Sequence, residues 1–83
     1  MNKVILYTSS FCGYCLAAKS LLSKRGIIFK EVNISLDPVL RKEILTKWNW
    51  HTVPLLIINN KLVGGYRELL NLDSLNKLDK FLN

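Results

Sequence analysis

Short apolar runs alternate with amphipathic stretches along the chain, and the first three segments predict a strand, a helix and a strand. Residues 3–7 form a short apolar run typical of a buried strand. Residues 16–23 place Leu or Ala at helical spacing, with Lys and Ser between them, so we predict a helix over residues 12–25 that ends at Gly26. Residues 27–34 are apolar, β-branched and partly alternating, which predicts a second strand parallel to the first.

A helix start signal opens the middle of the chain. Asp37 is a favourable N-cap residue and Pro38 suits the first helical position, so we predict a helix through about Lys47. The apolar positions on its core side are Val39, Leu40, Ile44 and Leu45. This helix is therefore expected to cover one face of a sheet.

Two more apolar runs, at residues 55–58 and 61–63, flank the dipeptide Asn59-Asn60. Such a pair of runs around two turn-forming residues predicts an antiparallel hairpin. The hairpin would add two strands to the strand pair of the first half of the chain.

The last part of the chain is expected to be helical. Gly64-Gly65 breaks the hairpin, and a helical stretch follows over residues 66–81, with an interruption near residues 71–73 where Asp73 could cap a new start. The order of the elements is strand–helix–strand, helix, hairpin and helix. It predicts an α/β fold with a four-stranded mixed sheet flanked by helices.

The composition narrows the class of protein. A chain of 83 residues has room for one domain, spanning residues 1–83, and its apolar runs fall far short of the roughly 20 residues that a membrane helix needs. The formal net charge is +6, yet the Lys and Arg residues are scattered and match no DNA- or RNA-binding motif, so we expect anionic partners other than nucleic acid. No signal-peptide pattern opens the chain, and a cytoplasmic protein is expected.

Cys12 and Cys15 are the only cysteines, and they lie where the first strand gives way to the first helix. Unpaired backbone N–H groups and the positive end of the helix dipole stabilise a thiolate at such a place, which lowers the pKa of Cys12 and makes it a nucleophile. Cys15, one turn inside the helix, is expected to be the buried resolving thiol. The spacing therefore predicts thiol–disulfide exchange.

Three other interpretations of the cysteine pair compete with redox chemistry. A zinc site needs four ligands, and His51 is the only histidine that could join the two cysteines. A structural disulfide between these cysteines would close a very short loop and so constrain the unfolded chain little. Two reduced core cysteines are the third alternative, although buried structural cysteines rarely lie at a helix start.

Four motifs occur together along nearly the whole chain: Tyr7-Thr8, Cys12-Gly13-Tyr14-Cys15, Thr52-Val53-Pro54 and Gly64-Gly65-Tyr66. At these separations they resemble the glutaredoxins, a family with the thioredoxin fold. The resemblance implies a glutathione-dependent thiol–disulfide oxidoreductase that acts on protein disulfides and glutathione mixed disulfides through Cys12 and Cys15. It also implies a monomer for which glutathione is the reductant.

The resemblance further implies which residues contact glutathione. They are Tyr14, Thr52, Val53, Pro54, Gly65, Tyr66 and Arg67. Pro54 is expected to follow a cis peptide bond, which would turn the Val53 backbone toward Cys12. Gly64 and Gly65 would let the backbone approach the γ-glutamyl carboxylate, which would rest on N–H groups at the next helix start.

Three positions depart from the family pattern. Gly13 stands where many dithiol members have proline, which leaves the redox potential open. Ser9 replaces a lysine that in many members polarises the nucleophile, and Lys47 or Arg41 are the candidates to compensate. Arg67 replaces an acidic or serine residue that usually meets the γ-glutamyl group, so its charge would oppose the ammonium of the ligand and assist its carboxylate.

These departures support two alternative functions. Gly65-Tyr66-Arg67 is similar to the Gly-Phe-Arg of redoxins that supply ribonucleotide reductase and are recharged by thioredoxin reductase. Gly13 supports a second alternative, a [2Fe–2S] cluster bound by a dimer, and Trp50 gives secondary support. The ligands of this cluster would be Cys12 of each chain and two glutathiones. The dimer would then exist only with its cluster, and no other metal is expected.

Overall fold

The computed structural model of the protein describes residues 1–83 and contains four strands, three α-helices and one 3₁₀ turn. The elements are β1 (Val4–Thr8), α1 (Gly13–Lys24), β2 (Lys30–Asn33), α2 (Pro38–Lys47), β3 (Leu55–Ile58), β4 (Lys61–Gly64), α3 (Tyr66–Ser74) and η1 (Leu78–Phe81). None of the helices has the length and apolarity that a membrane crossing requires.

The four strands form one mixed sheet in the order β2-β1-β3-β4. Strand β1 pairs in parallel with β2 and antiparallel with β3, and β3 continues into β4 through a hairpin. Asn59 and Asn60 both have positive φ, 50° and 63°, which asparagine tolerates and which suits a two-residue hairpin turn. The predicted parallel strand pair, the hairpin and the four-stranded mixed sheet are therefore confirmed.

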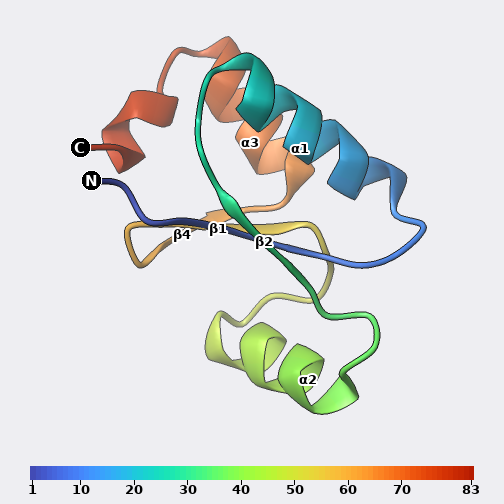
Figure 1. Ribbon diagram of the computed structural model, residues 1–83. Coiled ribbons are helices and arrows are strands. Elements are labelled where there is room, and N and C mark those ends of the chain that lie inside the picture. Colours follow the sequence, from blue (N-terminus) through green and yellow to red (C-terminus); the bar gives the residue numbers. More distant parts are fainter.

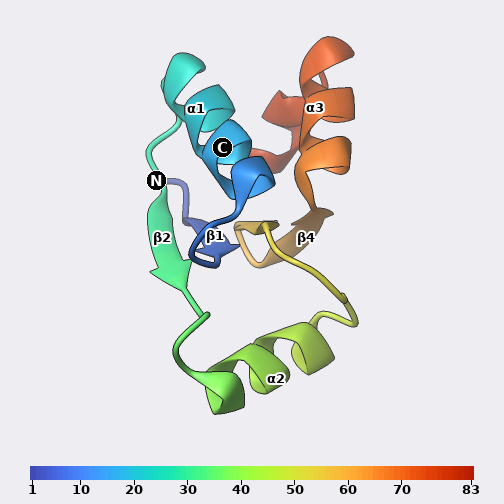
Figure 2. The same ribbon diagram turned by 90° about the vertical axis from the view of Figure 1, so that its right-hand side faces the viewer.

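The helices lie on both faces of this sheet, with α1 and α3 on one face and α2 on the other (Figure 1). The quarter turn in Figure 2 shows the same separation, with α1 and α3 side by side above the strands. A core of nine buried residues joins the first face to its helices: Val4, Leu6, Ala18, Leu22, Leu56, Ile58, Val63, Leu69 and Leu78. Alternation along the strands places Ile5, Tyr7 and Ile57 on the opposite face, where they line a hollow with Lys47 and Trp48 from the end of α2.

Helix α1 ends as the sequence predicts. Gly26 has φ 70°, a left-handed conformation that glycine adopts without steric cost, and Ile27 N–H donates to the Leu22 carbonyl at 2.9 Å. The chain then leaves the helix and returns along the sheet toward β2.

The final helix breaks later than predicted. Helix α3 runs to Ser74, and Asn76 takes the left-handed conformation with φ 53°, while Lys77 N–H donates to the Leu72 carbonyl at 2.9 Å. The expected break near residues 71–73 is therefore wrong, because asparagine rather than an aspartate cap ends this helix. Asp73 lies inside α3 and pairs with Arg25.

Three other sequence predictions need correction. The second strand covers only Lys30–Asn33, because β1 offers it partners only from Ile5 to Thr8, and Ile28 is left 90% exposed. On α2 no residue is fully buried, and Val39, which we placed on the core side, is exposed. On α1 the apolar stripe is narrower than predicted, because Leu16 points to solvent.

Candidate functional site

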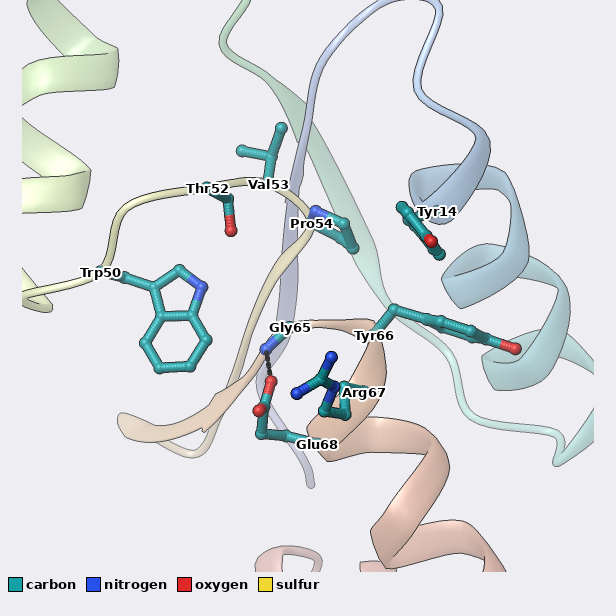
Figure 3. Close-up of a pocket in the computed structure, with 9 residues that line it drawn as sticks. All are labelled: Tyr14, Trp50, Thr52, Val53, Pro54, Gly65, Tyr66, Arg67 and Glu68. Carbon is teal, nitrogen blue, oxygen red and sulfur yellow. Dashed lines mark hydrogen bonds between the residues drawn. The ribbon is translucent and has the colours of Figure 1, made fainter.

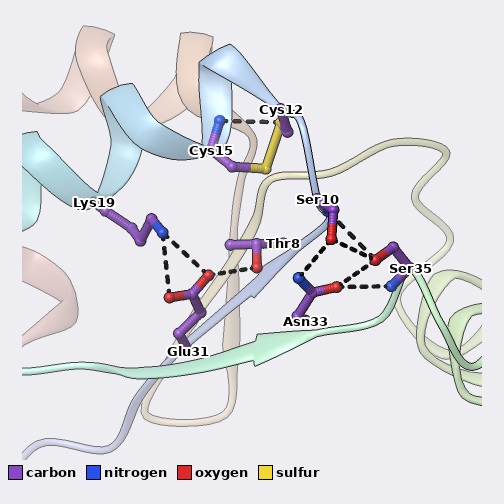
Figure 4. A network of polar contacts seen from close by, with 8 residues as sticks. All are labelled: Thr8, Ser10, Cys12, Cys15, Lys19, Glu31, Asn33 and Ser35. Atoms are coloured by element: carbon purple, nitrogen blue, oxygen red, sulfur yellow. Dashed lines mark hydrogen bonds and ion pairs between the residues drawn. A yellow bond between two sulfur atoms is a disulfide. The ribbon is translucent and has the colours of Figure 1, made fainter.

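The two cysteines form a disulfide at the N-terminus of α1 (Figure 4). Cys12 is the N-cap residue, with extended backbone, and its Sγ accepts a hydrogen bond from the Cys15 N–H at 3.1 Å. Cys12 is partly exposed, whereas Cys15 is only 2% exposed. The predicted helix-start position of Cys12 and the burial of Cys15 are confirmed, and the alternative of two reduced core cysteines is wrong for this structure.

Beside the disulfide lies a groove of about 380 Å³ (Figure 3). Its lining contains all seven residues that the family resemblance assigns to glutathione: Tyr14, Thr52, Val53, Pro54, Gly65, Tyr66 and Arg67. They come from the start of α1, from the loop before β3 and from the start of α3, so segments far apart in sequence meet here. Trp50 and Glu68 complete the lining.

Two features shape the side of the groove nearest the cysteines. The Val53–Pro54 peptide bond is cis, as the resemblance predicts, and Pro54 is buried at the entrance to β3. The rings of Tyr14 and Tyr66 lie with their centroids 5.9 Å apart, which links the first turn of α1 to the first turn of α3. Tyr14 follows Cys12 by two positions, so the groove and the disulfide are neighbours.

The far side of the groove is the N-terminus of α3. Glu68 Oε1 accepts a hydrogen bond from the Gly65 N–H at 2.9 Å, which is the reciprocal half of a capping box. The N-cap residue Gly65 has no side chain, so the other half is absent and the next N–H groups of the first turn have no intrahelical acceptor. A Cβ at Gly64 would lie 2.7 Å from Glu68 Cγ, and its φ of 124° also requires glycine.

A second hollow, lined by both cysteines, contains a polar network (Figure 4). The buried Thr8 hydroxyl donates to Glu31 Oε2 at 2.7 Å, and Lys19 Nζ lies 3.3 Å from both Glu31 oxygens. The Thr8 hydroxyl, followed by Lys19, holds the pKa of Glu31 below its ordinary value. Sequence reasoning missed Lys19, although its position four residues after Cys15 places both on one helix face.

Ser9 and Gly13, two of the positions that depart from the family pattern, lie next to the cysteines in the structure. Ser9 lines the hollow beside the cysteines, but neither Lys47 nor Arg41 lines that hollow or the groove. Lys47 Nζ instead lies 5.3 Å from the centroid of the Trp48 ring, on the α2 face of the sheet. The structure therefore places neither candidate beside the cysteines to compensate for Ser9, and Lys19 is the cation that lines the hollow. A Cβ at Gly13 would meet no atom within 4 Å, so packing around the Cβ position does not require glycine there.

Metal ligands are sparse within the chain. The structure contains no group of three or more His, Cys, Asp or Glu side chains that could hold a metal ion, and His51 is exposed. This arrangement gives the zinc alternative no support. The [2Fe–2S] hypothesis draws ligands from two chains and from glutathione, so it stays a prediction.

A disulfide at a helix start, on a four-stranded mixed sheet and beside a cis-proline loop, defines a redox protein with a thioredoxin-like fold. The glutaredoxin family profile matches residues 4–63. A glutaredoxin of Pseudomonas aeruginosa is 39% identical over 83 residues, covering 100% of this chain and 99% of the relative. The chain belongs to the glutaredoxin family, and it is a thiol–disulfide oxidoreductase.

Solved structures agree with this assignment. A glutaredoxin from Brucella melitensis is 39% identical with a TM-score of 0.86, and the match covers 96% of this chain and 87% of that one. A dithiolic glutaredoxin from Trypanosoma brucei brucei is 33% identical with a TM-score of 0.85, covering 99% of this chain and 88% of the other. The predicted thioredoxin/glutaredoxin fold is thereby confirmed.

Proposed function

We propose that the protein is a glutathione-dependent oxidoreductase that reduces glutathione mixed disulfides and protein disulfides in the cytoplasm, acting as a monomer. One observation carries the proposal: a groove next to the partly exposed Cys12 is lined by all seven residues expected to contact glutathione. The Sγ of Cys12 also accepts a hydrogen bond from the Cys15 N–H. Glutaredoxins use glutathione as their reductant, which supports the same reductant here.

Cys12 is the nucleophile in this proposal. Its thiolate, stabilised by the Cys15 N–H, attacks the glutathione sulfur of a mixed disulfide, and the protein thiolate leaves. A second glutathione thiolate then attacks the sulfur of the glutathione held on Cys12. This step releases glutathione disulfide and restores the Cys12 thiolate. In the net reaction one free glutathione is consumed, the protein thiol is freed, and both glutathione sulfurs leave as glutathione disulfide.

Cys15 is needed only for protein disulfides. Cys12 attacks one sulfur of the substrate disulfide, and the Cys15 thiolate then attacks Cys12 Sγ, which frees the reduced substrate and leaves the disulfide seen in the structure. Burial of Cys15 keeps it from outside reagents while holding it within bonding distance of Cys12. The reduction potential expected from the family is about −200 to −230 mV.

Two substitutions test these roles. Cys12→Ser should abolish glutathione-dependent turnover coupled to NADPH and glutathione reductase, because no other thiol is exposed. Cys15→Ser should keep the reduction of glutathione mixed disulfides and lose the reduction of protein disulfides. Full activity in Cys12→Ser would contradict the assignment, and equal loss of both activities in Cys15→Ser would contradict the division of roles.

A second candidate is a redoxin that supplies ribonucleotide reductase and is recharged by thioredoxin reductase. The placement of Arg67 in the groove favours it, because the sequence Gly65-Tyr66-Arg67 is similar to the Gly-Phe-Arg of such redoxins. Reduction of the Cys12–Cys15 disulfide by glutathione and by thioredoxin reductase should be compared directly. Reduction by the reductase alone would favour the second candidate over the first.

A further inference from the structure

The groove beside the disulfide contains hydrogen-bond donors that have no partner in the protein. Trp50 Nε1 is buried without an acceptor, and the indole edge that carries it faces Pro54 and Gly65 in Figure 3. The two ion pairs of the structure are Lys19–Glu31 and Arg25–Asp73, so the Arg67 guanidinium has no carboxylate partner. The first-turn N–H groups of α3 add further donors at the same end.

The groove offers little to a cation at this end. Glu68 is its only acidic residue, and its Oε1 is already bound to the Gly65 N–H. The Glu68 stem is held against Gly64, because its Cγ occupies the space that a Cβ there would need. Figure 3 shows the Arg67 guanidinium on the side of α3 that faces Gly65 and Pro54, so a ligand reaching the helix start meets the free positive charge of Arg67.

We propose that Arg67 is a specificity-determining residue that makes the groove prefer small thiols whose end at α3 carries a carboxylate and no free ammonium. This inference rests on the proposed function, because it concerns the ligand of the same groove. A carboxylate can take charge-assisted hydrogen bonds from a guanidinium and from helix N-terminal N–H groups together. An ammonium beside that carboxylate would be repelled by Arg67.

Glutathione is an informative probe because its γ-glutamyl end carries both charges. N-acetylglutathione differs only by acylation of the amine, which removes the positive charge and keeps both carboxylates. The preferred substrates are therefore disulfides of amine-free or N-acylated anionic thiols. Glutathione itself remains a substrate, but with a penalty set by Arg67.

The experiment uses the fully reduced protein and two mixed disulfides of one fluorescent cysteine peptide, with glutathione and with N-acetylglutathione. In a single turnover, the Cys12 thiolate attacks the small-thiol sulfur, the peptide thiolate leaves, and its release is followed by stopped-flow fluorescence. Each rate is divided by the rate with dithiothreitol, which corrects for the intrinsic reactivity of the two disulfides. We expect the N-acetylated substrate to react about threefold faster with the native protein.

Substitution of Arg67 should reverse this preference. Arg67→Asp is expected to change the ratio of the two corrected rates by about tenfold in favour of glutathione, with Arg67→Gln between the two. Lys42→Asp is the matched control, because it makes the same change in net charge at an exposed position of α2 and should keep the native ratio. A ratio that is the same in the native protein, Arg67→Gln and Arg67→Asp would overturn the inference.

Failure of the Arg67 specificity role and failure of the proposed function give different experimental results. If both mixed disulfides are reduced at rates that do not depend on residue 67, the specificity role of Arg67 is wrong and the proposed function stands. If neither is reduced while a protein disulfide is, glutathione dependence is wrong, and the inference that rests on it falls as well. A change of ratio in Lys42→Asp equal to that in Arg67→Asp would show a long-range charge effect and overturn the specific role.

Discussion

The two faces of the sheet are built very differently. On the α1 and α3 side, both helices bury side chains completely, including Leu22 and Leu69, and an ion pair joins Arg25, the C-cap residue of α1, to Asp73 of α3. On the other side, α2 buries no residue completely, although the strand residues beneath it, such as Leu55, are themselves buried. One face is therefore a packed core, while the other is a sheet surface covered by a lightly anchored helix.

The functional site draws different parts from these two faces of the sheet. The disulfide belongs to α1, and one wall of the groove belongs to α3, so both rest on the packed face. The α2 side contributes only the loop that carries Trp50 and leads into the Val53–Pro54 bond. Geometry at the reactive sulfurs thus depends on the core, whereas the opposite wall depends on a segment with few buried contacts.

The largest expected effect comes from removing a core side chain on the packed face. Leu22 of α1 is fully buried in the core cluster that includes Leu69 of α3 and the strand residues, so Leu22→Ala should lower the free energy of unfolding by about 3 kcal/mol through lost burial and a cavity. The matched substitution on the other face, Ile44→Ala, should cost about 1 kcal/mol, because Ile44 is only partly buried. Urea unfolding followed by circular dichroism measures the free energy of unfolding of both variants. Equal losses of stability would contradict the difference between the two faces of the sheet.

Much of the packed face and of the redox pair was predictable, because the signals are local. The position of the cysteines at a helix start, the Gly26 stop and the Asn59-Asn60 turn each depend on a few neighbouring residues. Burial on α2 was not predictable in this way. The apolar spacing predicts a core face, but how deeply that face is buried depends on the distance between the helix and the sheet, which the spacing does not encode.

The groove could not be predicted from local sequence signals either. Its seven predicted residues could be named only through the family resemblance, since they come from three separate segments. Glu68 was missed because its N-cap partner is Gly65 and not the Ser or Thr that marks a capping box in a sequence. Lys19 of α1 was missed because its partner Glu31 lies on a different element, strand β2. The shortened β2 has a similar cause, because its length is set by the partners that β1 offers.

A smaller effect is expected at the start of α2. Asp37 Oδ1 accepts the Leu40 N–H at 3.0 Å, and Asp37→Ala should cost this helix about 1 kcal/mol. Because α2 buries no side chain fully, the loss should appear as local opening, with amide exchange in α2 faster by about fivefold and exchange in α1 unchanged. Asp37→Asn retains a capping oxygen and should behave like the native protein. Equal acceleration of exchange in α1 and α2 would show that the two faces unfold together.

The smallest effect concerns pH and belongs to the packed face. The Thr8 hydroxyl and Lys19 lower the pKa of Glu31 from its ordinary value of 4.5, and the Arg25 guanidinium lowers the pKa of Asp73 from 3.8. A carboxyl with a lowered pKa stabilises the folded state above its unfolded pKa, and this stability is lost as the pH falls through the folded value. Unfolding free energy should therefore decline as the pH falls below about 4.5.

The double variant Glu31→Gln, Asp73→Asn tests the source of this decline. It should be less stable than the native protein at pH 7 and should lose less stability on acidification, because neither position can then be protonated. The effect should be smaller than that of the Asp37 cap, since both pairs lie near solvent and are screened by salt. Glu43→Gln, at an exposed position of α2, removes a carboxylate from the other face and should leave the native decline in place. An unchanged acid decline in the double variant would show that these two carboxylates do not set the acid stability of the packed face.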